Sequence, residues 1–388
     1  MDQLKRTWVE INIDNLEHNY YEIRSVLGPG TKMMAVVKAD GYGHGAAQVS
    51  RTFQDCGVDW FGVSNIIEAR TLRKAGITKP ILILGYTPEE NARDLYELSC
   101  TQCVFGEEYA EKLDESARSE NVVVDVHIKL DTGMNRLGFD IHNTDDLVAT
   151  LAKVCYLPNL KVTGIFTHFA AADENTENGH YYTAMQHRRF ATVMDELAMR
   201  GFEFLDVHCC NSGGTVFYPE YHHTMVRPGV IIYGCSPNGK PLDAVNLKPA
   251  MTLKSVVSFV KTVGAGEKIS YGCTYESYED MKIATIPIGY ADGYPRSLSN
   301  RGYAFVRDHV VPIVGRVCMD QTMLDVTGID AKEGDVVTLF GGDVPIGMDN
   351  VAGIAGTINY EIMCGISRRV QRVYLKKGEV QEVVDYTL

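Results

Sequence analysis

Short apolar runs alternate with longer amphipathic stretches between residue 30 and about residue 235. The eight apolar runs are Met33–Val37, Trp60–Val63, Ile81–Leu84, Cys103–Phe105, Val122–Ile128, Val162–Phe166, Phe202–Val207 and Met225–Tyr233. Helical patterns fill most of the intervals, for example Glu89–Ser99, Glu107–Ser119, Asp146–Val154 and Thr183–Met199. Several runs do not alternate with polar residues, which is typical of parallel strands buried on both faces. The pattern predicts a (β/α)8 barrel, with a doubly wound open sheet as the competing architecture.

The pattern changes on both sides of this region. Ahead of it, Trp8–Ile13 alternates like a strand, and Asp14 is expected to cap the following helix with Glu17 as its capping-box partner. After Gly234, strand-like segments are separated by Gly-rich turns, and one helix-like interval interrupts them. The strand-like segments are Leu253–Val263, Lys282–Ile288, Tyr303–Val306, Val311–Val317 and Asp335–Leu339, and the helix-like interval is Asn350–Cys364. We therefore expect a barrel over residues 1–240 and a mainly-β domain over residues 241–388, which the first strand (about residues 7–13) joins.

Length, charge and cysteine content narrow the class of protein. A chain of 388 residues favours two domains, and a net charge of −13 argues against binding to nucleic acid or to an acidic membrane. No run approaches the roughly 18 apolar residues of a membrane span, and the start of the chain lacks a signal-peptide pattern, so we expect a cytoplasmic protein. The ten cysteines form no disulfide framework. Cys100 and Cys103 lack a second pair at zinc-site spacing, so no metal is expected.

Reactive side chains gather directly after the apolar runs, where a barrel of this kind carries its chemistry. They are Lys38, Tyr86, Asp131, Arg136, His168, Asn211, Ser212 and, within the last run, Arg227. Random placement would scatter such groups along the helices as well. The clustering therefore favours an active site at the carboxyl ends of the strands.

Lys38 is the most informative of these residues. A lysine that ends a buried strand lies in a poorly hydrated cleft, which lowers the pKa of its amine and suits it to Schiff-base chemistry. The alternative is a lysine that extends to solvent from the barrel rim. The following Ala-Asp-Gly-Tyr-Gly-His-Gly has glycines at alternate positions, and their spacing fits neither a Rossmann motif nor a P-loop.

The whole chain resembles the alanine racemase family. The segment Ala35–Gly45 looks like the family's motif for the lysine that binds pyridoxal 5'-phosphate (PLP). The similarity continues, in the family's order and spacing, through Leu84–Tyr86, Lys129–Gly138, Gly164–Ala170, Asn211–Gly213, Arg227–Val230, Ile269–Gly272, Ile286–Gly293, Gly315–Asp320 and Thr357–Ile362. The resemblance implies a PLP-binding barrel, a C-terminal β domain and a head-to-tail homodimer with shared active sites.

Individual roles carry over by the same resemblance. Lys38 would hold the PLP aldehyde as a Schiff base, His168 would lie near the ring, and Arg227 would face the ring nitrogen with His208 behind it. The phosphate would be bound by the side chains of Tyr42, Ser212 and Tyr360 and by the backbone amides of Ser212, Gly229 and Val230, because such amides form a concave anion site.

Racemisation needs an acid–base group on each side of the substrate Cα. The resemblance assigns Lys38 to one side and Tyr271, reaching across the dimer, to the other. Arg136 and the backbone amide of Met319 of the second subunit would bind the substrate carboxylate, and Tyr290 and Tyr360 would narrow the entrance. The supporting residues would be Lys129 (carbamylated in some family members), His208, Asn211, Cys318 and Asp320. Asn135 stands where the family often has a glycine, and asparagine tolerates positive φ.

These roles predict PLP-dependent interconversion of L- and D-alanine, supplying D-alanine for peptidoglycan. A racemase with serine or broader specificity is the alternative within the family. A basic-amino-acid decarboxylase is disfavoured by Arg227, since such enzymes place an acid at the ring nitrogen. A PLP-binding homeostasis protein resembles the barrel alone, whereas this chain continues with the residues that carry Tyr271 and Met319.

Overall fold

The computed structural model describes residues 5–141 and 144–386. Eight parallel strands follow one another around a barrel in the order β10-β2-β3-β4-β5-β6-β8-β9. Strand β10 is hydrogen-bonded to β2, and β9 stands at the other end of this order. In chain order they are β2 (Lys32–Val36), β3 (Trp60–Val63), β4 (Ile81–Ile83), β5 (Cys100–Val104), β6 (Val124–Asp131), β8 (Leu160–Phe166), β9 (Asp206–His208) and β10 (Met225–Val226). The Thr224 N–H donates to the Val207 carbonyl at 3.1 Å, which brings β9 beside β10. The predicted (β/α)8 barrel is confirmed, and each of the eight apolar runs overlaps one of its strands.

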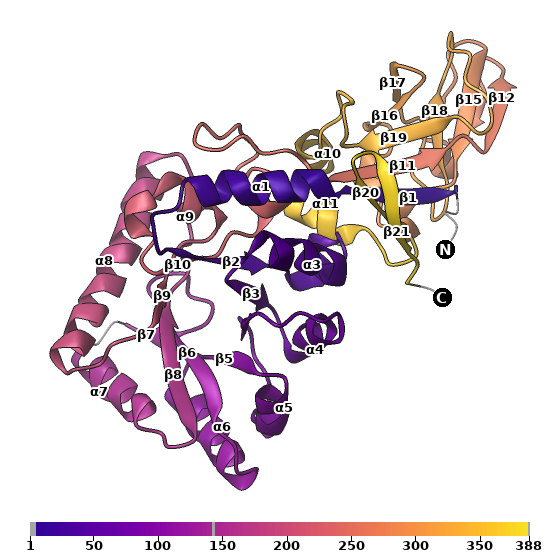
Figure 1. The fold of residues 1–388 in the computed structure, drawn as a ribbon. Coiled ribbons are helices and arrows are strands. Elements are labelled where there is room, and N and C mark those ends of the chain that lie inside the picture. The colour runs from indigo at the N-terminus through magenta and orange to yellow at the C-terminus, as the bar shows by residue number, and fades with distance from the viewer. Residues whose placement is uncertain (1–4, 142–143, 387–388) are drawn as a thin grey trace.

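Helices cover the outside of the barrel (Figure 1). They are α1 (Ile13–Ser25), α3 (Ala46–Cys56), α4 (Ile66–Lys74), α5 (Ala92–Glu97), α6 (Glu107–Ser119), α7 (Thr144–Cys155) and α8 (Glu177–Met199), with the short α9 (Ser212–Phe217) after β9. Their buried positions recur with helical spacing, as in Val49 and Phe53 of α3. No helix in the described part of the chain combines the length and apolarity needed to cross a bilayer.

The last apolar run contains much less strand than its length suggests. Only Met225–Val226 pairs as a strand, whereas Val230–Tyr233 forms a 3-10 helix, η3. Pro228 lies between them and lacks the N–H that a central strand needs, although its carbonyl still accepts from the Val36 N–H at 3.0 Å. The chain therefore leaves the sheet early and turns across the mouth of the barrel.

The first helix begins earlier than the sequence indicates. Strand β1 covers Thr7–Asn12 and α1 follows at once, so the N-cap is Asn12, whose side chain accepts from the Asn15 N–H at 3.0 Å. The prediction that Asp14 caps this helix is wrong. Asp14 lies in the first turn, and its carboxylate accepts from the Lys377 N–H at 2.6 Å.

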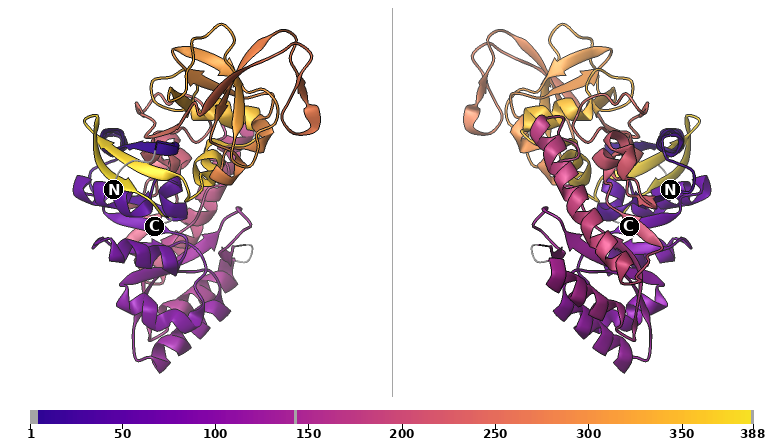
Figure 2. Two further views of the ribbon diagram at one scale, coloured as in Figure 1. Left: turned by 90° about the vertical axis from the view of Figure 1, so that its right-hand side faces the viewer. Right: turned by 90° about the vertical axis from the view of Figure 1, so that its left-hand side faces the viewer.

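The C-terminal region is mainly β structure and lies beyond one end of the barrel (Figure 2). Its seven-stranded sheet has the order β17-β16-β19-β11-β1-β20-β21, in which β1 pairs antiparallel with β11 and parallel with β20. The bounds are β11 (Met251–Val256), β16 (Tyr303–Val306), β17 (His309–Pro312), β19 (Val336–Phe340), β20 (Gln371–Lys376) and β21 (Glu379–Val384). The first strand of the chain thus lies inside a sheet that is otherwise built from strands after residue 250.

Smaller elements complete this region. A three-stranded sheet contains β12 (Phe259–Val263), β15 (Met281–Ile286) and β18 (Thr322–Asp325), and β13 (Lys268–Ile269) pairs with β14 (Tyr275–Glu276). The run predicted as one strand over Leu253–Val263 is therefore two strands in two sheets. The interval predicted as one helix is also divided, into α10 (Met348–Ala355) and α11 (Asn359–Gly365), because Gly356 adopts φ +79° and ends α10.

Candidate active site

The chain turns left-handed directly after Lys38. Ala39, Asp40, Gly41, Tyr42 and Gly43 all have positive φ, between 52° and 79°. The Gly41 N–H donates to the Val37 carbonyl at 2.9 Å, and the Gly43 N–H donates to the Ala39 carbonyl at 3.0 Å. Each non-glycine residue in this conformation costs about 1–2 kcal/mol. The turn places the side chains of Lys38 and Tyr42 on the same cavity.

A cavity of about 560 Å³ opens at the carboxyl ends of the barrel strands. The residues with predicted roles that line it are Lys38, Tyr42, Lys129, Arg136, His168, Asn211, Ser212, Arg227, Gly229 and Tyr360. Tyr360 comes from α11 of the C-terminal region, and the others come from the barrel. Tyr86 does not line the cavity: its ring is exposed and its hydroxyl donates to Glu89 at 3.1 Å.

Other lining residues were not singled out from the sequence. They include Ser64, Phe166, Asp173, Pro237 and Cys364. Phe166 ends β8 and Ser64 follows β3, so the rule that sites lie at strand ends could have found them. Asp173, Pro237 and Cys364 lie in loops or on a helix, where no local pattern marks them.

The Lys38 amine lies in an environment that favours its neutral form. Burial lowers its pKa most, and the nearby Arg136 guanidinium lowers it further. The opposing effect of the Glu68 carboxylate is smaller. Glu68 instead holds the backbone, accepting from the Ala39 N–H at 2.8 Å and the Ser64 N–H at 2.7 Å. Lys38 is therefore suited to act as a nucleophile and as a base.

Arg227 is fixed by hydrogen bonds on two sides. Its Nη1 donates to His208 Nδ1 at 2.8 Å, and its Nη2 donates to His168 Nδ1 at 3.2 Å and to the Thr167 carbonyl at 2.8 Å. Burial, followed by the charge of Arg227, holds the pKa of both histidines well below the ordinary value. Each imidazole is therefore neutral, accepts from the guanidinium through Nδ1 and carries its proton on Nε2.

The hydrogen bonds continue from His208 into the barrel core. With its proton on Nε2, His208 donates to His127 Nδ1 at 3.0 Å. The far side of His127 faces Asp206, at 4.0 Å between Nε2 and Oδ2, and Asp206 pairs with Lys32 at 2.7 Å. Arg227 is thus supported by a row of neutral imidazoles, which leaves its charge directed toward the cavity.

Free amides surround Gly229 on one wall of the cavity. Ser212 and Val230 begin the short helices α9 and η3, so their N–H groups have no acceptor within those helices, and among the described residues they donate to no other acceptor. The Gly229 N–H donates to Ser212 Oγ at 2.9 Å. A Cβ at Gly229 would lie 2.6 Å from the Tyr42 hydroxyl, so only glycine leaves this concavity open. The arrangement is suited to a phosphate-sized anion.

Lys129 and the loop after β6 form another part of the cavity lining. The Lys129 amine donates to the Leu137 carbonyl at 3.1 Å, and burial lowers its pKa to about 8. The Asp131 carboxylate accepts from the backbone N–H groups of Asn135 and Arg136 at 2.9 and 3.1 Å, which shapes the loop that carries Arg136. Asn135 adopts φ +53°, the conformation that the sequence led us to expect it to tolerate.

The remaining predicted residues lie in the C-terminal region. Tyr271, Cys318, Met319 and Asp320 line a second cavity of about 770 Å³, and Tyr290 lines a third of about 250 Å³ together with Tyr271 and Cys318. None of these five residues lines the barrel cavity of the same chain. The side chains of Tyr271 and Met319 are 71% and 54% exposed, so this surface is open to another molecule.

The cavity at the barrel mouth is the candidate active site of an enzyme. It combines a lysine at a strand end, an arginine held by two histidines and a concave group of backbone amides. Family models described as alanine racemase, N-terminal domain, and alanine racemase, C-terminal domain, match residues 11–237 and 250–374. The chain belongs to the alanine racemase family. The predicted family and enzyme class are confirmed.

Individual relatives agree with this assignment along the whole chain. The alanine racemases of Desulforamulus reducens and Methanococcus maripaludis are 44% and 43% identical, each over 95% of this chain and 98% of the relative. The solved structure of alanine racemase from Clostridium difficile 630 has a TM-score of 0.93 at 38% identity and covers 100% of both chains. That of the Bacillus anthracis enzyme with bound L-Ala-P has a TM-score of 0.93 at 34% identity, over 100% of this chain and 99% of that one.

Proposed function

We propose that this protein interconverts L- and D-alanine with PLP, in a homodimer whose two active sites each use both subunits. The observation that carries the proposal is the barrel cavity, where the Lys38 amine of lowered pKa shares one space with Arg136, Arg227 and the amides around Gly229. We divide the chain into a barrel over residues 1–240 and a second domain over residues 241–388, which would supply Tyr271 and Met319 to the partner.

The residues of the cavity fit PLP. Lys38 would hold the aldehyde, the amides of Ser212 and Val230 with the side chains of Tyr42, Ser212 and Tyr360 would hold the phosphate, and Arg227 would face the ring nitrogen beside His168. When bound, PLP withdraws electrons from an amino acid attached to it and so makes the Cα proton removable. The protein supplies the binding, the orientation and the proton-handling groups.

Arg227 would keep the ring nitrogen unprotonated. Burial lowers the pKa of Arg227 to about 10, so the guanidinium stays charged at neutral pH and releases no proton to a pyridine. The two neutral histidines and the carbonyls of Thr167 and Cys209 accept the other hydrogen bonds of the guanidinium. By leaving the ring nitrogen unprotonated, Arg227 would favour racemisation over transamination when PLP is bound.

Two bases on opposite sides of Cα would exchange the proton. Lys38 supplies one, and the exposed position of Tyr271 in the C-terminal region suits it to reach the partner's barrel as the other. Arg136 and the Met319 amide would hold the substrate carboxylate, and Tyr290 and Tyr360 would narrow the entrance. Lys129, His208, Asn211, Cys318 and Asp320 would support these groups.

The reaction is tested by incubating the PLP-loaded protein with L-alanine and with L-serine and measuring D-product by chiral chromatography. We expect D-alanine to form faster than D-serine, and no carbon dioxide release from lysine or ornithine. Tyr271→Phe should retain PLP and cut turnover by about 10²-fold or more, with unequal losses in the two directions, because one of the two bases is lost. Tyr278→Phe, at an equally exposed tyrosine of the same region, should leave turnover unchanged.

A product of D-alanine would suit a role in supplying peptidoglycan from the cytoplasm. Faster formation of D-serine would favour the broader-specificity alternative. A protein that binds PLP without forming any D-product would contradict the racemase proposal and favour a homeostasis role.

A further inference from the structure

The peptide between Cys318 and Met319 has a fixed orientation. The Cys318 carbonyl accepts from the Tyr290 N–H at 3.0 Å, and the Met319 carbonyl accepts from the Ala291 N–H at 3.0 Å. Since C=O and N–H point in opposite directions in a trans peptide, the Met319 N–H points away from the 289–291 segment. Among the described residues this N–H donates to no acceptor. A free donor with a set direction therefore lies on the exposed surface.

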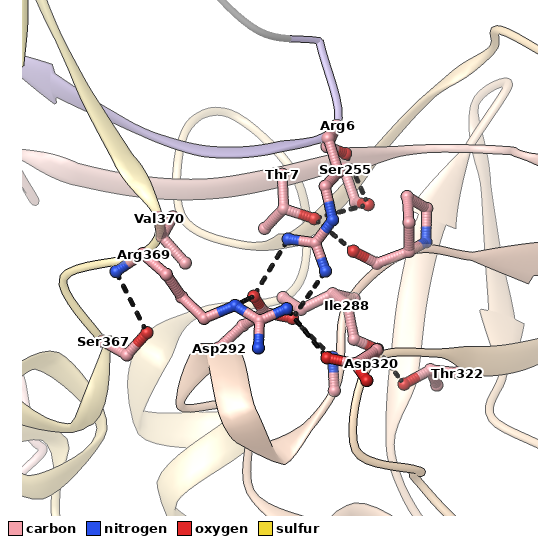
Figure 3. Close-up of polar contacts among 12 residues, drawn as sticks. Arg6, Thr7, Ser255, Ile288, Asp292, Asp320, Thr322, Ser367, Arg369 and Val370 are labelled. Carbon is pink, nitrogen blue, oxygen red and sulfur yellow. Dashed lines mark hydrogen bonds and ion pairs between the residues drawn. The ribbon is translucent and has the colours of Figure 1, made fainter. Parts of the chain in front are cut away.

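Asp292 anchors the segment on which this peptide rests (Figure 3). Its carboxylate is fully buried, and Oδ2 accepts from the Gly289 N–H at 3.0 Å. Arg6 donates to both carboxylate oxygens, at 3.0 and 3.3 Å, and Arg369 Nε lies 3.0 Å from Oδ1. A buried carboxylate needs such partners to offset its lost hydration. These contacts fix residues 289–292 to the start of β1 and to the chain ahead of β20.

Arg369 also contacts the residue that follows Met319 in the chain. Its Nη2 donates to Asp320 Oδ1 at 2.8 Å, directly after Met319 in the chain. Within the described residues Arg6 makes no such contact with Asp320. The planar guanidinium of Arg369 thus bridges the buried carboxylate of Asp292 and the half-exposed carboxylate of Asp320. A lysine ammonium does not reproduce this geometry.

We propose that Arg369, by bridging Asp292 and Asp320, is a positioning residue that sets the direction of the Met319 N–H toward the substrate carboxylate in the partner subunit's barrel. This rests on the proposed function above. Hydrogen bonds to a carboxylate weaken steeply as the donor turns away, so a tilt of this loop loosens the substrate without altering the two bases. The network therefore acts on KM for alanine rather than on kcat.

The matched pair Arg369→Lys and Arg6→Lys tests this in the full-length, PLP-loaded enzyme. Both variants keep the positive charge and both lose a guanidinium contact to the buried Asp292, so they share the structural cost. We expect Arg369→Lys to raise KM for L-alanine about three- to tenfold with kcat within about twofold, because a charge-assisted contact to a half-exposed group is lost. Arg6→Lys should leave KM within about twofold of the wild-type value.

Asp320→Asn provides a second variant that leaves the buried pairs of Asp292 intact. It should raise KM as Arg369→Lys does, with an unchanged melting temperature. The control Asp335→Asn breaks an Arg307–Asp335 pair of 2.6 Å in the same region and should leave KM unchanged. Equal KM values for the Arg6 and Arg369 variants, or a wild-type KM in Asp320→Asn, would overturn the positioning role. A wild-type enzyme that forms no D-alanine would instead contradict the proposed function.

Discussion

At the scale of single residues, the site depends on groups whose charge is set by burial. Arg227 remains charged because it is an arginine, while His168 and His208 beside it are neutral because burial and the guanidinium both lower their pKa. A carboxylate at residue 227 would be buried in the same way. It would be stabilised by a neighbouring proton donor, such as a protonated nitrogen of the PLP ring.

Replacing Arg227 by glutamate should therefore shift the reaction away from racemisation. We expect Arg227→Glu to increase pyruvate formed per D-alanine by about tenfold or more, because a protonated ring takes up more electron density. Coupled lactate dehydrogenase measures the pyruvate, and chiral chromatography measures the D-alanine. Arg227→Gln, which offers no carboxylate, is the control, and an unchanged ratio in Arg227→Glu would count against the role of Arg227.

Lys129 allows a prediction of pH dependence. Carbon dioxide reacts only with a neutral amine, and a pKa of about 8 leaves roughly a tenth of Lys129 neutral at pH 7, far more than for an ordinary lysine. Carbamylation should therefore increase from pH 6 to pH 8 and reverse on acidification. A carbamate resonance in ¹³C NMR with labelled bicarbonate would report it, and Lys129→Gln should remove it. A signal that survives in Lys129→Gln would assign the carbamate to another amine.

At the scale of elements, the left-handed turn after Lys38 is the part of the site most sensitive to backbone change. A Cβ at Gly43, where φ is +79°, would lie 2.2 Å from the Met363 carbonyl of α11, whereas a Cβ at Gly30, where φ is +86°, would meet no atom within 4 Å. Gly43→Ala should therefore melt at least about 5 °C below Gly30→Ala, because both share the cost of positive φ and only one adds a clash. Differential scanning fluorimetry of the PLP-free proteins measures this, and equal melting temperatures would contradict the tight packing of the turn on α11.

The elements that the sequence could predict are those with a strong local period. The apolar runs marked every barrel strand because parallel strands are buried on both faces, and strand ends marked the lysine, arginine and histidine positions. Local patterns could not show that Asn12 rather than Asp14 caps α1, or that Gly356 divides a helix. Nor could local patterns reveal the role of Asp292 as an anchor. Its partners Arg6 and Arg369 are brought together only when β1 enters the sheet of the C-terminal region.

At the scale of the whole molecule, the predicted site residues lie on two separate surfaces of one chain. Lys38 lines the cavity at the barrel mouth, and Tyr271 lines a different cavity on the C-terminal region. Under the proposed two-base reaction, the Lys38 amine and the Tyr271 phenol would meet one substrate when a second copy of the chain brings its C-terminal region to this barrel. Activity should therefore require the dimer.

Mixing two inactive variants tests this division. A Lys38→Ala homodimer lacks the lysine in both sites, and a Tyr271→Phe homodimer lacks the phenol in both. In a mixed dimer of the two, one site has lost both groups, while the other combines the intact Lys38 of one subunit with the intact Tyr271 of its partner. Random association of equal amounts makes half of the dimers mixed, so about a quarter of wild-type turnover should appear after unfolding and refolding the two together.

The single variants refolded alone set the background. Turnover no higher than that background, with mixed dimers shown by two affinity tags, would mean that both bases act from the same chain.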